Sequence, residues 1–119
     1  MQSLLEFILP SEIFKHFDIV ETKTILNEVH IYLYEKNVRP GGYDDIKLIS
    51  KGFTPEATIQ DFPLRDKALY LHVRRRKWQD EATGKIVSNK FELTAKGTQY
   101  SEGFAAFLKG VIGYIPDKF

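Results

Sequence analysis

One segment of the chain alternates apolar and polar residues and then ends in a block of cations. Residues 69–73 read Leu-Tyr-Leu-His-Val, and they are followed directly by Arg74, Arg75, Arg76 and Lys77. Alternation with a period of two is typical of a strand with one buried face. Four charged side chains in a row cannot continue a buried face, so we expect the core to end near Val73. The fold must therefore be built around a strand whose end reaches solvent.

A turn and a return strand are expected after these cations. Residues 80–85 read Asp-Glu-Ala-Thr-Gly-Lys, and the glycine permits the tight reversal of a hairpin. Residues 86–93 then predict the second arm. Alternate side chains of a strand point to opposite faces, so Arg74 and Arg76 are expected on one face and Arg75 and Lys77 on the other. The prediction is a protruding hairpin with a basic tip.

Further strands are expected before this hairpin. Val29, Ile31 and Leu33 alternate with polar or aromatic residues and predict a strand, whereas residues 37–42 contain Pro40 and two glycines and predict a loop. Weaker strand patterns cover residues 46–53 and residues 58–62, the second closed by Pro63.

Helices are expected at both ends of the chain. Residues 4–9 and 13–17 repeat apolar side chains at helical spacing, and Pro10 can begin the second helix. Near the C-terminus, with Ser101 as N-cap and Gly113 as stop, a single apolar stripe is formed by Phe104, Phe107, Leu108, Val111 and Ile112. We interpret the stripe as core; a dimer face is the alternative.

These elements predict an α+β fold: a small antiparallel sheet with a protruding basic hairpin, short N-terminal helices and a C-terminal amphipathic helix. The length of 119 residues fits one domain, 1–119. There is no cysteine, which excludes disulfides and thiolate metal sites and is consistent with the cytoplasm, our expected location. The apolar N-terminus is short and contains Glu6, and no apolar run is long enough to span a bilayer, so we expect neither a signal peptide nor a membrane partner.

Charge is distributed unevenly along the chain. Residues 1–60 have a net charge of −3, whereas residues 61–119 have a net charge of +4. The second half is therefore the expected face for a polyanion. The candidate DNA-binding residues are Arg74, Arg75, Arg76, Lys77, Trp78, Lys85, Lys90 and Lys96.

Two interpretations of this basic segment stay open. Its guanidinium groups would bind the phosphate backbone or enter a major groove, with Trp78 stacked on a base or capping the edge of the core. The alternative is a solvated strand end without a ligand, because a basic run alone is a weak motif.

Residues 58–78, in which Asp61-Phe62-Pro63 precedes a short turn, an alternating strand and an arginine-rich end, resemble the N-terminal region of ISAon-type transposases. More distantly, they resemble the zinc-binding N-terminal region of ISL-three-type transposases. Segments in the same order along the chain also resemble the ISAon-type region: residues 7–10, 30–33, 35–37, 50–53, 94–98 and 104–108. The resemblance implies binding to double-stranded DNA at the ends of a bacterial insertion sequence during transposition.

The chain departs from these families in two ways. The ISL-three-type relatives carry cysteine pairs around the basic strand, and this chain has none, so no thiolate zinc site is expected. The family's catalytic domain uses three separated acidic residues to hold two metal ions, and nothing in this sequence has that arrangement. The resemblance therefore implies a non-catalytic module, with a catalytic transposase subunit or a second copy of the chain as possible partners.

No cofactor or catalytic group is expected from the remaining residues. His16, His30 and His72 are placed in different elements without a neighbouring His or Cys, so we interpret each as a lone structural histidine. No acid–base pair predicts an enzyme. Two alternatives to DNA binding stay open: a protein-interaction or oligomerisation module that docks on a separately encoded catalytic subunit, and an RNA-binding module.

Overall fold

The computed structural model describes residues 9–64, 66–91 and 102–112. A four-stranded sheet, which we call sheet A, has the strand order β1-β2-β5-β4, and a three-stranded sheet, sheet B, has the order β3-β6-β7. The elements are α2 (Ser11–His16), β1 (Phe17–Ile25), β2 (Glu28–Glu35), β3 (Leu48–Phe53), β4 (Ala57–Leu64), β5 (Lys67–Arg74), β6 (Arg76–Asp80), β7 (Ile86–Val87) and α3 (Glu102–Ile112). The expected α+β class is confirmed.

Sheet A consists of two antiparallel hairpins, β1–β2 and β4–β5, which are joined by a parallel pairing of β2 with β5. In that pairing Val29 lies opposite Leu69, Ile31 opposite Leu71 and Leu33 opposite Val73. The small antiparallel sheet that was expected is therefore, in sheet A, a mixed sheet with one parallel pairing. Alternation along each strand predicted its buried face, but alternation contains no information on which strand lies beside it or in which direction.

Strand β1 was not predicted as a strand. Its first residue, Phe17, is buried, but from Val20 onward all its side chains are exposed, and a bulge shifts its register between Ile19 and Glu21. A strand exposed on both faces has no hydrophobic alternation, which is why the pattern gave no signal.

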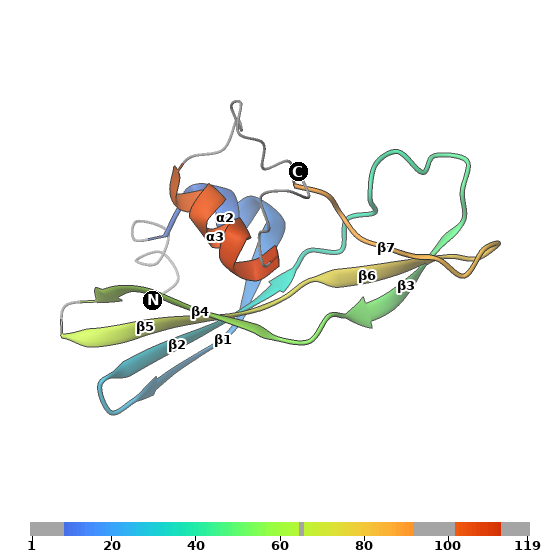
Figure 1. The fold of residues 1–119 in the computed structure, drawn as a ribbon. Helices are drawn as coiled ribbons and strands as arrows, with labels where there is room; N and C mark the ends of the chain where they lie inside the picture. Colours follow the sequence, from blue (N-terminus) through green and yellow to red (C-terminus); the bar gives the residue numbers. More distant parts are fainter. Residues whose placement is uncertain (1–8, 65, 92–101, 113–119) are drawn as a thin grey trace.

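The core lies between sheet A and the two helices, α2 and α3, which cover one face of the sheet (Figure 1). Phe104 and Leu108 of α3 and Ile13 of α2 are completely buried, and Phe107 is nearly so. Phe104, Phe107 and Leu108 of the predicted stripe are thus core, and Val111 is partly buried against them. Of the predicted helix over residues 4–9, residues 4–8 lie outside the described residues and Leu9 is not helical; the cap Ser101 and the stop Gly113 also lie outside the described residues.

Two glycines allow α3 to approach its neighbours closely. A Cβ atom at Gly110 would lie 3.1 Å from Cδ1 of Ile59 in β4, and one at Gly103 would lie 2.9 Å from Cγ of Pro10. Gly110 costs helix propensity, and the structure gives the reason for its position: the helix packs on sheet A through this residue.

Sheet B extends beyond the helices (Figure 1). The expected hairpin forms as β6 and β7, with the chain reversing over residues 80–85, where Gly84 has a φ of +77°. Its return arm is shorter than predicted, because β7 ends at Val87 and residues 88–91 are not strand. Strand β4 is longer than predicted: it continues through Pro63, which an edge strand tolerates.

Candidate nucleic-acid interface

The three arginines lie at the junction of the two sheets rather than at the tip of the hairpin. Arg74 ends β5 in sheet A, Arg76 begins β6 in sheet B, and Arg75 connects the two strands. The turn of the hairpin instead carries Asp80, Glu81 and Lys85. The prediction of an arginine tip is therefore wrong, because the chain passes from one sheet into the other at Arg75 and the hairpin begins only after it.

Arg75 is held on both its backbone and its side chain. Its backbone N–H donates to Thr54 Oγ1 at 3.1 Å, and its carbonyl accepts from the N–H of Thr54 at 2.8 Å. Its guanidinium donates to the carbonyl of Asn89 and lies 5.3 Å from the ring centre of Phe91. Only 15% of its side chain is exposed, and its Nε is 3.8 Å from Oε1 of Glu35. Arg75 is a structural cation.

Glu35 is the anion that organises this junction. It ends β2 on the buried face, with an exposed fraction of 3%. Its Oε1 accepts the backbone N–H of Arg76 at 2.9 Å, and its carbonyl accepts Nε–H of Arg76 at 2.9 Å. Burial raises the pKa of Glu35 above its ordinary value, although the hydrogen bond from Arg76 and the charge of Arg75 oppose that rise. One carboxylate thus fixes two of the three arginines.

The position of Glu35 in the sequence indicates that the arginines have a buried anionic partner. Glu35 follows Val29, Ile31 and Leu33 in the same alternation, which assigns a carboxylate to the buried face of the strand. A buried carboxylate requires a cationic or hydrogen-bonding partner. The arginines after β5, the parallel neighbour of β2, supply it.

The remaining arginine and the tryptophan are also engaged within the fold. The guanidinium carbon of Arg74 lies 5.9 Å from the ring centre of Tyr34, and that of Arg76 lies 4.7 Å from the ring centre of Phe53. Trp78 has an exposed fraction of 8% and lies opposite Ser50 and Val87 in sheet B. Of the two interpretations of Trp78, its burial favours packing at the edge of the core over stacking on a base.

The lysines have more access to solvent. Lys85 and Lys90 are exposed, and Lys77 is half-buried on the strand that carries Trp78. Lys96, the last of the predicted DNA-binding residues, lies outside the described residues.

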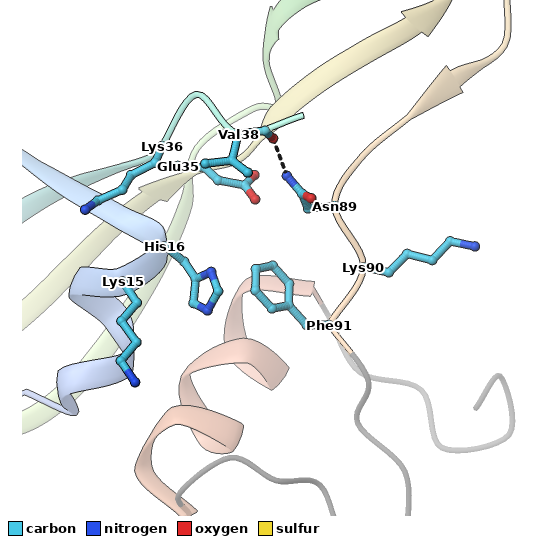
Figure 2. A pocket seen from close by; sticks show the side chains of 8 residues that line it. All are labelled: Lys15, His16, Glu35, Lys36, Val38, Asn89, Lys90 and Phe91. Atoms are coloured by element: carbon cyan, nitrogen blue, oxygen red, sulfur yellow. Dashed lines mark hydrogen bonds between the residues drawn. The ribbon is translucent and has the colours of Figure 1, made fainter. Parts of the chain in front are cut away.

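Lys90 also lines a pocket of about 290 Å³ beside the junction. The pocket lies between the end of α2, the end of β2 and the segment after β7, and is lined by Lys15, His16, Glu35, Lys36, Val38, Asn89, Lys90 and Phe91. Figure 2 shows the rings of His16 and Phe91 side by side, in an edge-to-face contact, while the side chains of Lys15, Lys36 and Lys90 extend outward in different directions. The three ammonium groups surround the pocket instead of filling it, an arrangement that suits an extended polyanion better than a small enclosed anion.

The electrostatics at His16 indicate a positive environment. Burial lowers the pKa of His16 below 6.5, and the charges of Lys15 and Lys36 lower it further, against a smaller opposing effect of Glu12. The imidazole packs between Phe91, with ring centres 5.2 Å apart, and Phe104, with ring centres 5.7 Å apart. Lys15 and Lys36 were not among the predicted site residues, because they are isolated lysines in the acidic half of the sequence and only the fold brings them to Lys90.

Neither a metal site nor a membrane-spanning helix is present in the part of the chain that the structure describes. Within residues 9–64, 66–91 and 102–112, no three His, Asp or Glu side chains are arranged to hold a metal ion. Neither α2 nor α3 has the length and apolar character needed to cross a bilayer. The chain matches no protein-family model, no curated protein and no solved structure.

Proposed function

We propose that this chain is a DNA-binding module of a bacterial insertion-sequence transposase, and that it binds element-end DNA in the cytoplasm without catalysing strand transfer. The observation that carries the proposal is the grouping of Lys15, Lys36 and Lys90 from three separate segments around one pocket. Lysines bind phosphate as point charges and suit a contact to the backbone of duplex DNA. The choice of element-end DNA rests on the resemblance of several segments of the sequence to ISAon-type transposases.

The proposal assigns different roles to arginines and lysines. Arg75 and Arg76 fix the junction between the two sheets through their contacts with Glu35. The lysines, in contrast, contact phosphate. The ion pair of Lys36 with Asp18, at 3.7 Å between exposed side chains, is weak enough to yield to a phosphate. Lys77 and Lys85 lie in the hairpin of sheet B, where Lys85 is exposed and Lys77 half-buried, and the proposal gives them a secondary role in phosphate contact.

Salt dependence of duplex binding tests this assignment. For the triple variant Lys15→Gln, Lys36→Gln, Lys90→Gln, we expect the slope of log affinity against log salt to decrease by about 0.9 for each phosphate that the variant no longer neutralises. Lys23→Gln is the matched control, because Lys23 is a half-exposed lysine of β1 that does not line the pocket. Wild-type and triple-variant slopes that agree within error would contradict the proposal.

A protein-interaction module remains the second candidate, because sheet B exposes an apolar row. Ile49 is 39% exposed and Ile86 is 49% exposed, and both lie in register with Gln79 of β6 between them. A separately encoded catalytic subunit is the partner that this alternative implies. Ile49→Lys with Ile86→Lys would abolish that association and leave DNA affinity intact; an association that survives both substitutions would remove this candidate.

A further inference from the structure

The open face of sheet A carries a chain of hydrogen bonds that connects its two hairpins. His30 of β2 and His72 of β5 are 2.7 Å apart, measured from Nδ1 to Nε2. The second nitrogen of His30, Nε2, lies 2.9 Å from Oε1 of Glu28, and that of His72, Nδ1, lies 2.8 Å from Oε1 of Glu56. The prediction of lone histidines is wrong for this pair, because parallel pairing places two strands that are distant in sequence side by side.

The number of protons in this chain follows from its geometry. Four groups in the order Glu, His, His, Glu are joined by three hydrogen bonds, and each bond requires one proton between its two heavy atoms. Two neutral imidazoles and two carboxylates together hold only two protons, one on each ring. With only two protons, at least one of the three contacts would place two lone pairs against each other at 2.7–2.9 Å.

We infer that His30 and His72 share one extra proton in the folded protein, so that this contact is a proton-dependent joint between the two hairpins of sheet A. The joint lies where it can affect the stability of the whole sheet, because β2 and β5 form the parallel pairing through which the two hairpins meet. Water reaches the site only in part: 15% of the His30 side chain and 12% of the His72 side chain are exposed.

The groups around the pair favour a shared positive charge. Glu28 on β2 and Glu56 before β4 flank it, and Thr58 on β4 lies 3.3 Å from Nδ1 of His72. The rings of Tyr70 and Tyr32 stack on the outer sides of the pair, with centres 5.0 Å from His30 and 4.4 Å from His72.

Two cations lie farther out on the same face, each over a tyrosine ring. Lys23 of β1 lies 5.4 Å from the ring centre of Tyr32 and is paired with Glu21 at 3.6 Å, and Arg74 of β5 lies over Tyr34. Neither cation has a hydrogen bond to the pair among the described residues, so the two carboxylates are the nearest charges.

A shared proton predicts that stability depends on pH with a maximum. At alkaline pH the folded protein holds this extra proton and the unfolded chain does not, so stability falls as the pH rises. In acid the unfolded chain binds an extra proton on each of the two rings, whereas the folded pair shares one, so stability falls as the pH decreases. On either side of the stability maximum, the unfolding constant changes by up to tenfold per pH unit.

The first test is a ¹⁵N and ¹H NMR spectrum of the histidine rings in the wild-type chain near pH 6.5. We expect three N–H protons on the four nitrogens of His30 and His72, one of them strongly downfield. His16→Phe should retain this signal and His72→Phe should remove it. Two neutral rings with one N–H each would overturn the inference.

The second test compares the unfolding free energy of wild type and the variant His30→Phe, His72→Phe between pH 6.5 and 8.5. Phenylalanine keeps the stacked column but carries no proton. We expect the unfolding constant of the wild type to rise with pH across this range, by up to tenfold per unit, and that of the variant to stay flat. Parallel profiles would overturn the inference; if the variant does not fold, the wild-type slope and spectrum still decide it.

Discussion

Sheet A and sheet B differ in how they are stabilised, although one continuous stretch of chain, β5 into β6, runs through both. Sheet A buries alternate side chains of β2 and β5 under two helices, whereas the buried apolar side chains of sheet B among the described residues are Trp78 and Val87. Stability is therefore concentrated in sheet A. Sheet B is connected to sheet A at Glu35 and Arg75, and it exposes Ile49 and Ile86.

The largest expected effect is a core substitution in sheet A. Leu71→Ala should lower the free energy of unfolding by about 3–4 kcal/mol, because Leu71 is 1% exposed and its removal leaves a cavity beneath the helices. Ile49→Ala in sheet B is the control and should change it by less than about 0.5 kcal/mol. Urea unfolding of both variants measures the difference, and similar losses would show that the two sheets share one core.

The junction between the sheets should be nearly as sensitive. Arg75→Met leaves the carboxylate of Glu35 buried without its cation, for which we expect a loss of about 3 kcal/mol. Lys85→Met removes an exposed cation from the hairpin turn and should have an effect within about 0.5 kcal/mol.

A double-mutant cycle sharpens this prediction. Adding Glu35→Gln to Arg75→Met should recover part of the loss, because the buried charge is gone. Equal effects of Arg75→Met and Lys85→Met would mean that the arginine is not structural, and would return it to the set of candidate phosphate contacts.

The fold could be predicted from sequence where burial is one-sided. β2 and β5 alternate and α3 has a stripe, and all three formed as expected. β1 could not be predicted, because a strand that is exposed on both faces has no hydrophobic periodicity. The parallel pairing of β2 with β5 could not be predicted either, because the pattern within a strand does not determine which strand lies beside it.

The candidate site was predicted less well than the fold. The arginine run was correctly identified as the end of the core, but a consecutive run of cations does not reveal whether a buried anion lies opposite. Glu35 is distant from Arg75 in sequence and beside it in space. Lys15, Lys36 and Lys90 come from three separate segments, and only the fold places them around one pocket.

A smaller effect is expected where α3 packs on sheet A. Gly110→Ala should destabilise the protein by about 1 kcal/mol. The added methyl group would press on Ile59, and the energy of this overlap should exceed the gain in helix propensity. Combining it with Ile59→Val removes Cδ1 but keeps Cγ1, which would also lie 3.1 Å from the new Cβ, so only part of the loss should be recovered. A stabilisation by Gly110→Ala alone, measured by thermal unfolding, would show that the helix can move away from β4.

The smallest effect concerns His16, and it connects the pocket to the proposed ligand. The pKa of His16 is lowered below 6.5 in the folded chain, so between that lowered pKa and 6.5 the unfolded chain binds a proton that the folded chain does not. Its contribution to stability is complete above pH 6.5 and is lost as the pH falls below it. His16→Phe keeps the ring between Phe91 and Phe104 and should remove this part of the pH profile, while the contribution of His30 and His72 cancels in the difference.

Duplex DNA placed against Lys15, Lys36 and Lys90 brings phosphate charge near His16 and should raise its pKa, which NMR titration measures. An unchanged His16 pKa in a saturated complex would place the DNA elsewhere, on sheet B, and would leave the pocket to a different ligand.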